Sequence, residues 1–319
     1  MRTGGNVYRT VGNAVDTGAE MTIEKQRVDA RTVYVDGATL SVYEQGDPNG
    51  EILVLVHGWP DTHHLWDGVL PHLTSRFRVV TYDTRGHGRS TGRGTVEEMK
   101  LEQLASDFMA VVDAVAGSTP VHVLAHDWGS VQVWEAICEP GADTRISSFT
   151  SISGPSLDHM GTWLQNPRFT PMGMWQWISQ MASGAYTLFF MSGPVPRLFF
   201  RVFGRRWIWS LLLRIVERVD KRQLQFAPTF RQDMVAGLRI YRANVLRKVL
   251  RPQERYTHVP VHLLVTTRDP AIRPASFAGV ERWASKVSRT DVRSGHWLPL
   301  KDPALVARET TAFVERIQK

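Results

Sequence analysis

The chain has 319 residues, of which 43% are apolar and eleven are Trp, and this composition indicates a globular protein with a substantial core. Its length suits one large α/β domain with an insertion, or two small domains. The sequence contains no run of about twenty apolar residues, which a membrane-spanning helix would need, and no apolar segment near its start that is typical of a secretion signal.

The net charge of +7 is concentrated in one stretch, because residues 197–251 contain fourteen Lys or Arg and only three acidic residues. No motif typical of nucleic-acid recognition accompanies this charge, so we expect no nucleic-acid partner. Two interpretations stay open: a solvated helix face, or a basic and aromatic surface that makes peripheral contact with anionic lipid. The single Cys138 can form no internal disulfide, which favours a cytoplasmic protein.

The first half of the chain contains short apolar runs that are typical of strands. Strands are predicted at 31–35, 40–45, 52–56, 77–82, 121–125 and 146–152. The first two flank Asp36-Gly37, a pair typical of a hairpin turn. Apolar residues at helical spacing predict a helix over 101–112. Residues 1–28 lack such patterns and are expected to form a loosely ordered N-terminal extension.

The pattern changes over 157–251, which holds Trp and Met clusters and basic helical stretches but no convincing strand. Alternation of strands and helices then resumes. We predict a strand at 261–266, a helix near 275–284, a strand near 290–292 and a closing helix over 303–317. The sequence therefore predicts an α/β fold with a mostly parallel eight-stranded sheet, flanked by helices and interrupted by a helical cap. The predicted core comprises 29–156 and 256–319, and the predicted cap is 157–255.

The strand that starts at Val121 stops at Ala125, and an amphipathic run opens with Trp-Gly-Ser two residues later. This order predicts a strand, a sharp turn with Asp127 at its tip, and a helix. So tight a turn needs small neighbours, here Ala125 and Gly129. Free N–H groups at the helix start favour a negative charge there. Asp127 is thus either a nucleophile or an ordinary helix N-cap, and the motif alone does not decide.

Asp269 and His296 each follow a strand predicted late in the chain. Because the carboxyl ends of parallel strands meet at one edge of a sheet, both residues are expected to lie close to Asp127. The order of nucleophile, acid and histidine is that of the α/β-hydrolases.

The chain resembles the α/β-hydrolase superfamily over about residues 30–317, and within it the epoxide hydrolases that use an aspartate nucleophile. The matching pieces are His57-Gly58-Trp59-Pro60, the loop 83–90, the turn at Asp127, Asp269-Pro270 and Gly295-His296. One departure is Ala125, where the family usually has Gly. The chain is also similar to the hydrolase half of actinobacterial proteins that fuse such a domain to a short-chain dehydrogenase, although no second domain is expected here.

The resemblance implies a function and a set of catalytic groups. The backbone N–H groups of Trp59 and Trp128 would form an oxyanion hole, and the Trp59-Pro60 bond would be cis. Two cap tyrosines, Tyr186 and Tyr241, would donate to the departing epoxide oxygen. Asp127 would form an alkyl ester, which water activated by His296 then hydrolyses to a vicinal diol. No cofactor and no metal are expected.

The substrate is expected to be a small, apolar epoxide, and we place four further residues in its pocket: His57, Pro60, Trp163 and Trp297. His57 could instead shape the oxyanion loop. A haloalkane dehalogenase and a non-catalytic lipid-binding homologue remain alternative functions. A serine esterase is disfavoured because Ser130 lies three residues past the turn. Whether the protein is a monomer or a homodimer stays open.

Overall fold

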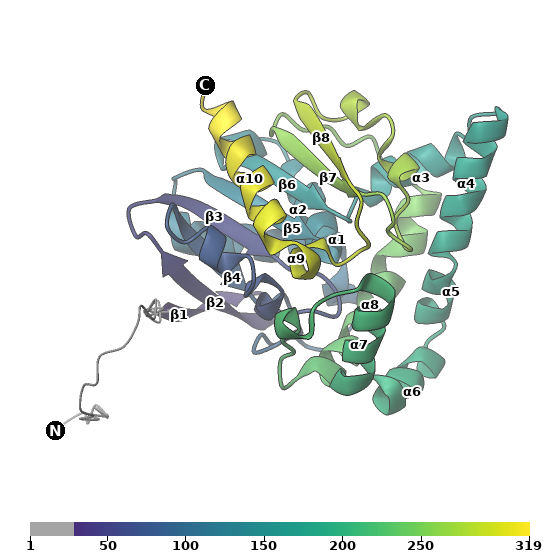
Figure 1. Ribbon diagram of the computed structural model, residues 1–319, viewed down its shortest axis with the longest axis horizontal. Helices are drawn as coiled ribbons and strands as arrows, with labels where there is room; N and C mark the ends of the chain where they lie inside the picture. The colour runs from purple at the N-terminus through teal and green to yellow at the C-terminus, as the bar shows by residue number, and fades with distance from the viewer. Residues whose placement is uncertain (1–28) are drawn as a thin grey trace, which may run out of the picture.

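The computed structural model describes residues 29–319, and the extension expected over 1–28 lies outside the described residues (Figure 1). The described strands form one sheet in the order β1-β2-β4-β3-β5-β6-β7-β8. Their bounds are β1 Asp29–Val35, β2 Ala38–Gly46, β3 Glu51–Val56, β4 Phe77–Tyr82, β5 Val121–His126, β6 Ile146–Ile152, β7 Val261–Thr266 and β8 Val287–Val292. β2 pairs antiparallel with β1 and with β4, and all other pairings are parallel. The predicted mostly parallel eight-stranded sheet is confirmed.

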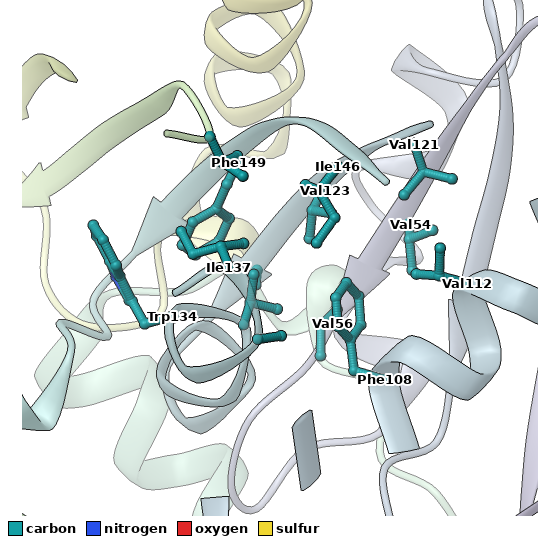
Figure 2. Close-up of a cluster of buried hydrophobic side chains, with 14 of the residues drawn as sticks. Val54, Val56, Phe108, Val112, Val121, Val123, Trp134, Ile137, Ile146 and Phe149 are labelled. Carbon is teal, nitrogen blue, oxygen red and sulfur yellow. The ribbon is translucent and has the colours of Figure 1, made fainter. Parts of the chain in front are cut away.

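Apolar side chains cover both faces of the sheet, which explains why its central strands are continuous apolar runs. In β3, Val54 and Val56 pack with the helices α1 (Leu101–Ala116) and α2 (Trp128–Ile137), and Figure 2 shows this cluster. Leu53 and Leu55 point to the opposite face, where they pack with side chains of α10 (Pro303–Ile317). All four side chains are fully buried, and each stabilises the fold by about 2 kcal/mol.

The predicted strands at 77–82, 146–152 and 261–266 and the closing helix at 303–317 have these bounds in the structure. The helix predicted near 275–284 is wrong. Two short 3-10 turns, Pro274–Phe277 and Val280–Arg282, stand in its place. Ala278 between them is extended and Gly279 has φ of 80°, so the helical hydrogen-bond pattern cannot continue through this point.

The segment between β6 and β7 is helical, and none of the described strands lies within it. Its α-helices are α3 Leu157–Gln165, α4 Pro171–Gly184, α5 Tyr186–Met191, α6 Pro194–Phe203, α7 Arg206–Leu212 and α8 Phe230–Leu250, with a π-helical turn, η5, at Leu213–Glu217. We propose 157–255 as the bounds of this cap. In the part of the chain that the structure describes, no helix is long and apolar enough to cross a membrane.

Helix α8 attaches the cap to the core through buried polar contacts. The side chain of Asn244 accepts from Leu101 N at 2.9 Å and donates to Met99 O at 2.7 Å, so it caps the first turn of α1. One turn further on, Lys248 Nζ donates to Glu135 of α2 at 2.9 Å and to Asp158 of α3 at 2.9 Å. These bonds satisfy groups that burial would otherwise leave unpaired, and they fix α8 over the carboxyl edge of the sheet.

Candidate active site

Asp127 lies at the tip of the turn between β5 and α2, with φ of 52°, a region that non-glycine residues seldom adopt. Close backbone approaches surround it. A Cβ on Gly129 would lie 2.4 Å from His57 O, and a Cβ on Gly154 would lie 2.2 Å from Asp127 O. These positions require glycine, whereas Ala125 is fully buried within β5 and fits.

Asp127 occupies the N-cap position of α2, yet its side chain forms no capping hydrogen bond. Instead, Asp127 Oδ2 accepts from the backbone N–H of Trp59 at 2.8 Å. A Cβ on Gly58 would lie 2.3 Å from the same oxygen, so the loop after β3 can approach the carboxylate only because position 58 is glycine. The peptide bond between Trp59 and Pro60 is cis, as predicted.

Asp269 and His296 lie beside Asp127, although 142 and 169 residues separate them from it in the sequence. Asp269 follows β7, and His296 follows β8. Asp269 Oδ2 bonds His296 Nδ1 at 2.8 Å, and His296 Nε2 lies 3.4 Å from Asp127 Oδ1. The imidazole thus bridges two carboxylates at the carboxyl edge of the sheet.

Electrostatic interactions within this group set its protonation. Burial lowers the pKa of His296, but the negative charges of Asp269 and Asp127 outweigh burial, and the pKa is raised well above its ordinary value. Burial works against the charge of Asp269, and the positive imidazole together with the N–H groups of Ala271 and Ile272 holds its pKa below the ordinary range. The resting site therefore contains an imidazolium between two carboxylates.

A cavity of about 400 Å³ lies between Asp127 and the cap. Tyr186 of α5 and Tyr241 of α8 line it, with ring centroids 6.2 Å apart. Burial, and then the nearby charge of Asp127, raises the pKa of Tyr186, and burial is also the main reason that the pKa of Tyr241 is raised well above its ordinary value. Both phenols therefore stay protonated and can donate hydrogen bonds into the cavity. The apolar part of the lining includes Val131, Leu157, Met160, Leu164, Met181, Leu188, Met191, Val245, Leu246 and Val249.

The second predicted oxyanion donor, Trp128, is the first residue of α2, and its ring lines the cavity. N–H groups in the first turn of a helix have no partner within the helix, so the Trp128 N–H is free of intrahelical bonding. Its ring stands edge-on to that of Tyr241, with centroids 4.9 Å apart.

The four residues placed in the pocket from sequence do not line this cavity. On α3 the lining residues are Leu157, Met160 and Leu164, and Trp163 is not among them. Trp297 Nε1 donates to Asp61 at 3.0 Å. Pro60 follows the cis bond in the loop after β3.

His57 is fully buried beneath the same loop, where it makes contacts on both sides of its ring. Its Nε2 accepts from Thr84 N at 2.9 Å, which leaves Nδ1 to donate to Gly58 O at 2.9 Å. Burial lowers the pKa of His57 to about 3, so the ring is neutral. His57 therefore supports the loop that carries Trp59 N and does not line the cavity.

Two polar residues of the cap contact the loops of the acid and the histidine, and sequence reasoning missed both. Gln180 of α4 donates to Ala271 O at 3.0 Å and accepts from Arg273 N at 2.7 Å, next to Asp269. Glu217 accepts from His296 N at 3.2 Å. Burial raises the pKa of Glu217. Nothing local in the sequence marks either residue, because their partners lie some 80 to 90 positions away.

Comparison with known proteins is consistent with this geometry. The family model described as the alpha/beta hydrolase fold matches residues 51–188. The chain is 37% identical over 290 residues to "Probable oxidoreductase EphD" of Mycobacterium tuberculosis. The matched region covers 88% of this chain and 48% of that protein. It therefore spans about half the length of this relative. It is also 33% identical over 128 residues to "Epoxide hydrolase A" of the same species, covering 40% of this chain and 39% of that protein.

Among solved structures, an epoxide hydrolase of Bacillus megaterium in complex with an inhibitor superposes with a TM-score of 0.74 at 19% identity, covering 89% of this chain and 100% of that chain. At such low identity the superposition shows the fold alone. The fold of the chain is that of the α/β-hydrolases.

Proposed function

We propose that this chain, which has the α/β-hydrolase fold and resembles epoxide hydrolases in sequence, converts an epoxide and water to a vicinal diol through an ester on Asp127. One observation carries the proposal: a carboxylate, rather than a hydroxyl, occupies the turn and shares one apolar cavity with two protonated phenols. A carboxylate that attacks an alkyl carbon gives an ester, and an ester can be hydrolysed. A serine would give an ether, which the same residues could not cleave.

In the first step, an oxygen of Asp127 attacks an epoxide carbon, and the bond between that carbon and the ring oxygen breaks. The ring oxygen takes up the electron pair, with Tyr186 and Tyr241 donating hydrogen bonds to it. One phenol transfers its proton to this oxygen and regains a proton from solvent. The pKa of each phenol is raised, so the tyrosines act chiefly by stabilising the developing charge in a site where little water competes.

Formation of the ester changes the state of His296. The charge of Asp127 helps to keep the pKa of His296 high, and esterification neutralises that charge. The pKa of His296 then falls, the imidazole loses its proton to solvent, and Nε2 becomes a general base. Asp269 keeps the ring oriented through Nδ1.

In the second step, His296 takes a proton from a water molecule, whose oxygen attacks Cγ of Asp127. The oxyanion that forms is stabilised by Trp59 N, which contacts this carboxylate at 2.8 Å, and by Trp128 N. When the oxyanion collapses, the bond between Cγ and the alkyl oxygen breaks, and the alkyl oxygen takes the proton from His296 as the diol leaves. The second proton of the water passes from the new carboxyl group of Asp127 to His296, which restores the starting site. The water oxygen stays on Asp127, so each diol carries an oxygen that belonged to the enzyme.

A single turnover in heavy-oxygen water tests the mechanism. With enzyme in excess over a styrene-type epoxide, the first diol should contain no heavy oxygen, and Asp127 should gain it. Heavy oxygen in the first diol would contradict an ester intermediate and support direct attack by water.

A trapping variant gives a second, independent measurement. His296→Gln should form the ester and hydrolyse it very slowly, so the protein mass should rise by the mass of the epoxide. Asp127→Asn is the matched control and should gain no mass. Both variants should still unfold in one cooperative transition above the assay temperature, which separates loss of chemistry from loss of fold.

A haloalkane dehalogenase would also use an aspartate and needs side-chain N–H donors that hold the halide. Trp59 Nε1 does not fill that role, because it donates to Met234 O of the cap at 3.0 Å. Halide release from chloroalkanes and bromoalkanes, measured beside diol formation, distinguishes the two activities. A non-catalytic lipid-binding homologue is disfavoured by the intact group of Asp127, Asp269 and His296, and it would turn over neither substrate.

A further inference from the structure

Exposed apolar side chains are concentrated on one part of the cap. Of the 22 large apolar side chains that are exposed in the described chain, 18 lie between residues 169 and 216, so this segment differs from the rest of the surface. We call it the apolar cap face. It comprises Phe169, Met172, Trp175, Ile178, Met181, Tyr186, Leu188, Phe189, Val195, Leu198, Phe199, Val202, Phe203, Trp207, Leu211, Leu212, Ile215 and Val216. Figure 1 shows α4, α5 and α6 along the flank of the molecule away from the sheet.

Helix α6 has apolar residues on its outer side as well as its inner side. Pro196 and Phe200 are buried, and the ring of Phe200 packs on those of Phe190 in the cap and Trp59 in the core. Leu198 is 64% exposed and Phe203 is 51% exposed, so the outward side is apolar too. A helix on the surface of a water-exposed protein usually presents polar side chains outward. Contiguous apolar surface of this kind typically marks a binding site.

The charge on the apolar cap face has one sign. The sequence contains no Asp or Glu between Asp158 and Glu217, whereas five arginines lie within 169–216. They are Arg197, Arg201, Arg205, Arg206 and Arg214, and all but Arg197 are exposed. The ion pairs among the described residues use other arginines. The surface is therefore apolar and positively charged at once.

The cavity opens next to this surface. Leu188 and Met181 line the cavity and are 63% and 47% exposed, so they lie where it meets solvent. Phe189, the neighbour of Leu188, contacts Phe199 of α6, and Phe199 contacts Phe203, with ring centroids 5.8 Å and 5.0 Å apart. A continuous row of apolar side chains thus runs from the cavity mouth across α6.

We propose that the apolar cap face docks on an anionic phospholipid surface and presents the cavity mouth to it. Apolar side chains would enter the boundary between headgroups and acyl chains, and the arginines would contact the phosphates. A second copy of the chain fits less well, because a twofold contact would bring the arginines of both copies together without a carboxylate. This docking implies a substrate class, and that step rests on the proposed function. The substrates would be apolar epoxides dissolved in a bilayer.

Vesicle sedimentation of the full chain tests the docking without any need for activity. The protein should sediment with phosphatidylglycerol-containing vesicles at low salt, less at high salt, and little with phosphatidylcholine alone. Arg201→Gln with Arg205→Gln should weaken partitioning about 25-fold, from about fivefold per arginine. Leu198→Ser with Phe203→Ser should also weaken it, with no change in the salt dependence.

The matched control is Lys286→Gln with Arg308→Gln, which removes the same charge from exposed positions of the core. It should bind vesicles as the parent does. Equal loss in the control would overturn the proposal, since net charge alone would then explain binding. Absence of sedimentation with anionic vesicles at low salt would also overturn it, as would a dimer that the Leu198→Ser and Phe203→Ser variant dissociates and that does not bind vesicles.

Activity measurements separate this proposal from the proposed function. Arg201→Gln with Arg205→Gln should hydrolyse a short, water-soluble epoxide at the parent rate but should be slower on a long-chain epoxide in anionic vesicles. An equal rate on the vesicle substrate would overturn substrate delivery from the bilayer. If no epoxide is hydrolysed while vesicle binding follows the pattern above, the proposed function fails and the docking surface stands.

Discussion

His57 couples the stability of the oxyanion loop to pH. In the folded protein its neutral ring accepts from Thr84 N and donates to Gly58 O, so a second ring proton would break the first of these bonds. Burial, and then the neighbouring His87, lowers the pKa of His57 to about 3 from an ordinary value of 6.5. Below pH 6.5 the unfolded chain binds a proton that the folded chain does not. The stability that the neutral His57 ring contributes is therefore fully present above pH 6.5 and is lost as pH falls toward 3.

The size of the effect follows from the two pKa values. At about pH 4.5, two units below the pKa of the unfolded state, protonation of His57 favours unfolding by about 3 kcal/mol. His57→Gln should remove this dependence, because a glutamine amide offers one donor and one acceptor and does not titrate. Other buried groups titrate equally in both proteins, so the difference between them isolates His57.

Urea unfolding of the parent and of His57→Gln, at several values between about pH 7.5 and 4.5, measures the difference. The variant should be less stable at neutral pH if its amide fits the site poorly, but its free energy of unfolding should fall less steeply on acidification. Parallel profiles for the two proteins would refute the reasoning and would mean that His57 is protonated in the folded state. Epoxide hydrolysis by the variant at neutral pH reports separately on the geometry of the loop.

Three further substitutions test other parts of the site. Tyr241→Phe should lower kcat/KM about 10²–10³-fold. Tyr186→Phe should lower kcat/KM less, because Tyr186 is 36% exposed and water can replace its hydroxyl. Rates equal to the parent rate in both variants would exclude both tyrosines as donors. Lys248→Met should cost about 3–5 kcal/mol of unfolding free energy in urea, since the buried Asp158 loses its cation and the buried Glu135 keeps only Arg255. A loss below about 1 kcal/mol would show that water reaches these carboxylates. Glu217→Gln keeps an acceptor for His296 N but removes a negative charge, so the pKa of His296 should fall and the acidic limb of the kcat profile should move to lower pH, with KM unchanged.

Local sequence patterns were sufficient to predict the strands of the sheet and the chain order of Asp127, Asp269 and His296. Strands such as 77–82 and 261–266 are mostly apolar because helices cover both faces, so their limits are visible without a structure. Asp127, Asp269 and His296 each follow a strand, and a parallel sheet brings strand ends together. Their convergence within 3.4 Å follows from topology rather than from any property of the intervening residues.

Local patterns were insufficient where a residue's role depends on a distant partner. Trp163 resembles a pocket residue, but the residues of α3 that line the cavity are Leu157, Met160 and Leu164. The 275–284 segment has helical spacing, yet Gly279 interrupts it. Gln180 is one of two glutamines in α4, and only the folded chain shows that it bonds the backbone near Asp269.

The contacts of the cap with the site decide which surface substitutions can be interpreted. Gln180 and Glu217 hold the loops of Asp269 and His296, and they belong to α4 and to η5, which also carry part of the apolar cap face. A substitution on those elements could change catalysis by shifting a loop, whether or not a lipid surface is present. Helix α6 carries no residue that hydrogen-bonds these loops; its buried Phe200 packs on the ring of Trp59, whereas Leu198 and Phe203 are exposed. Substitutions on the outer side of α6 should therefore alter docking while the chemistry of the site continues unchanged.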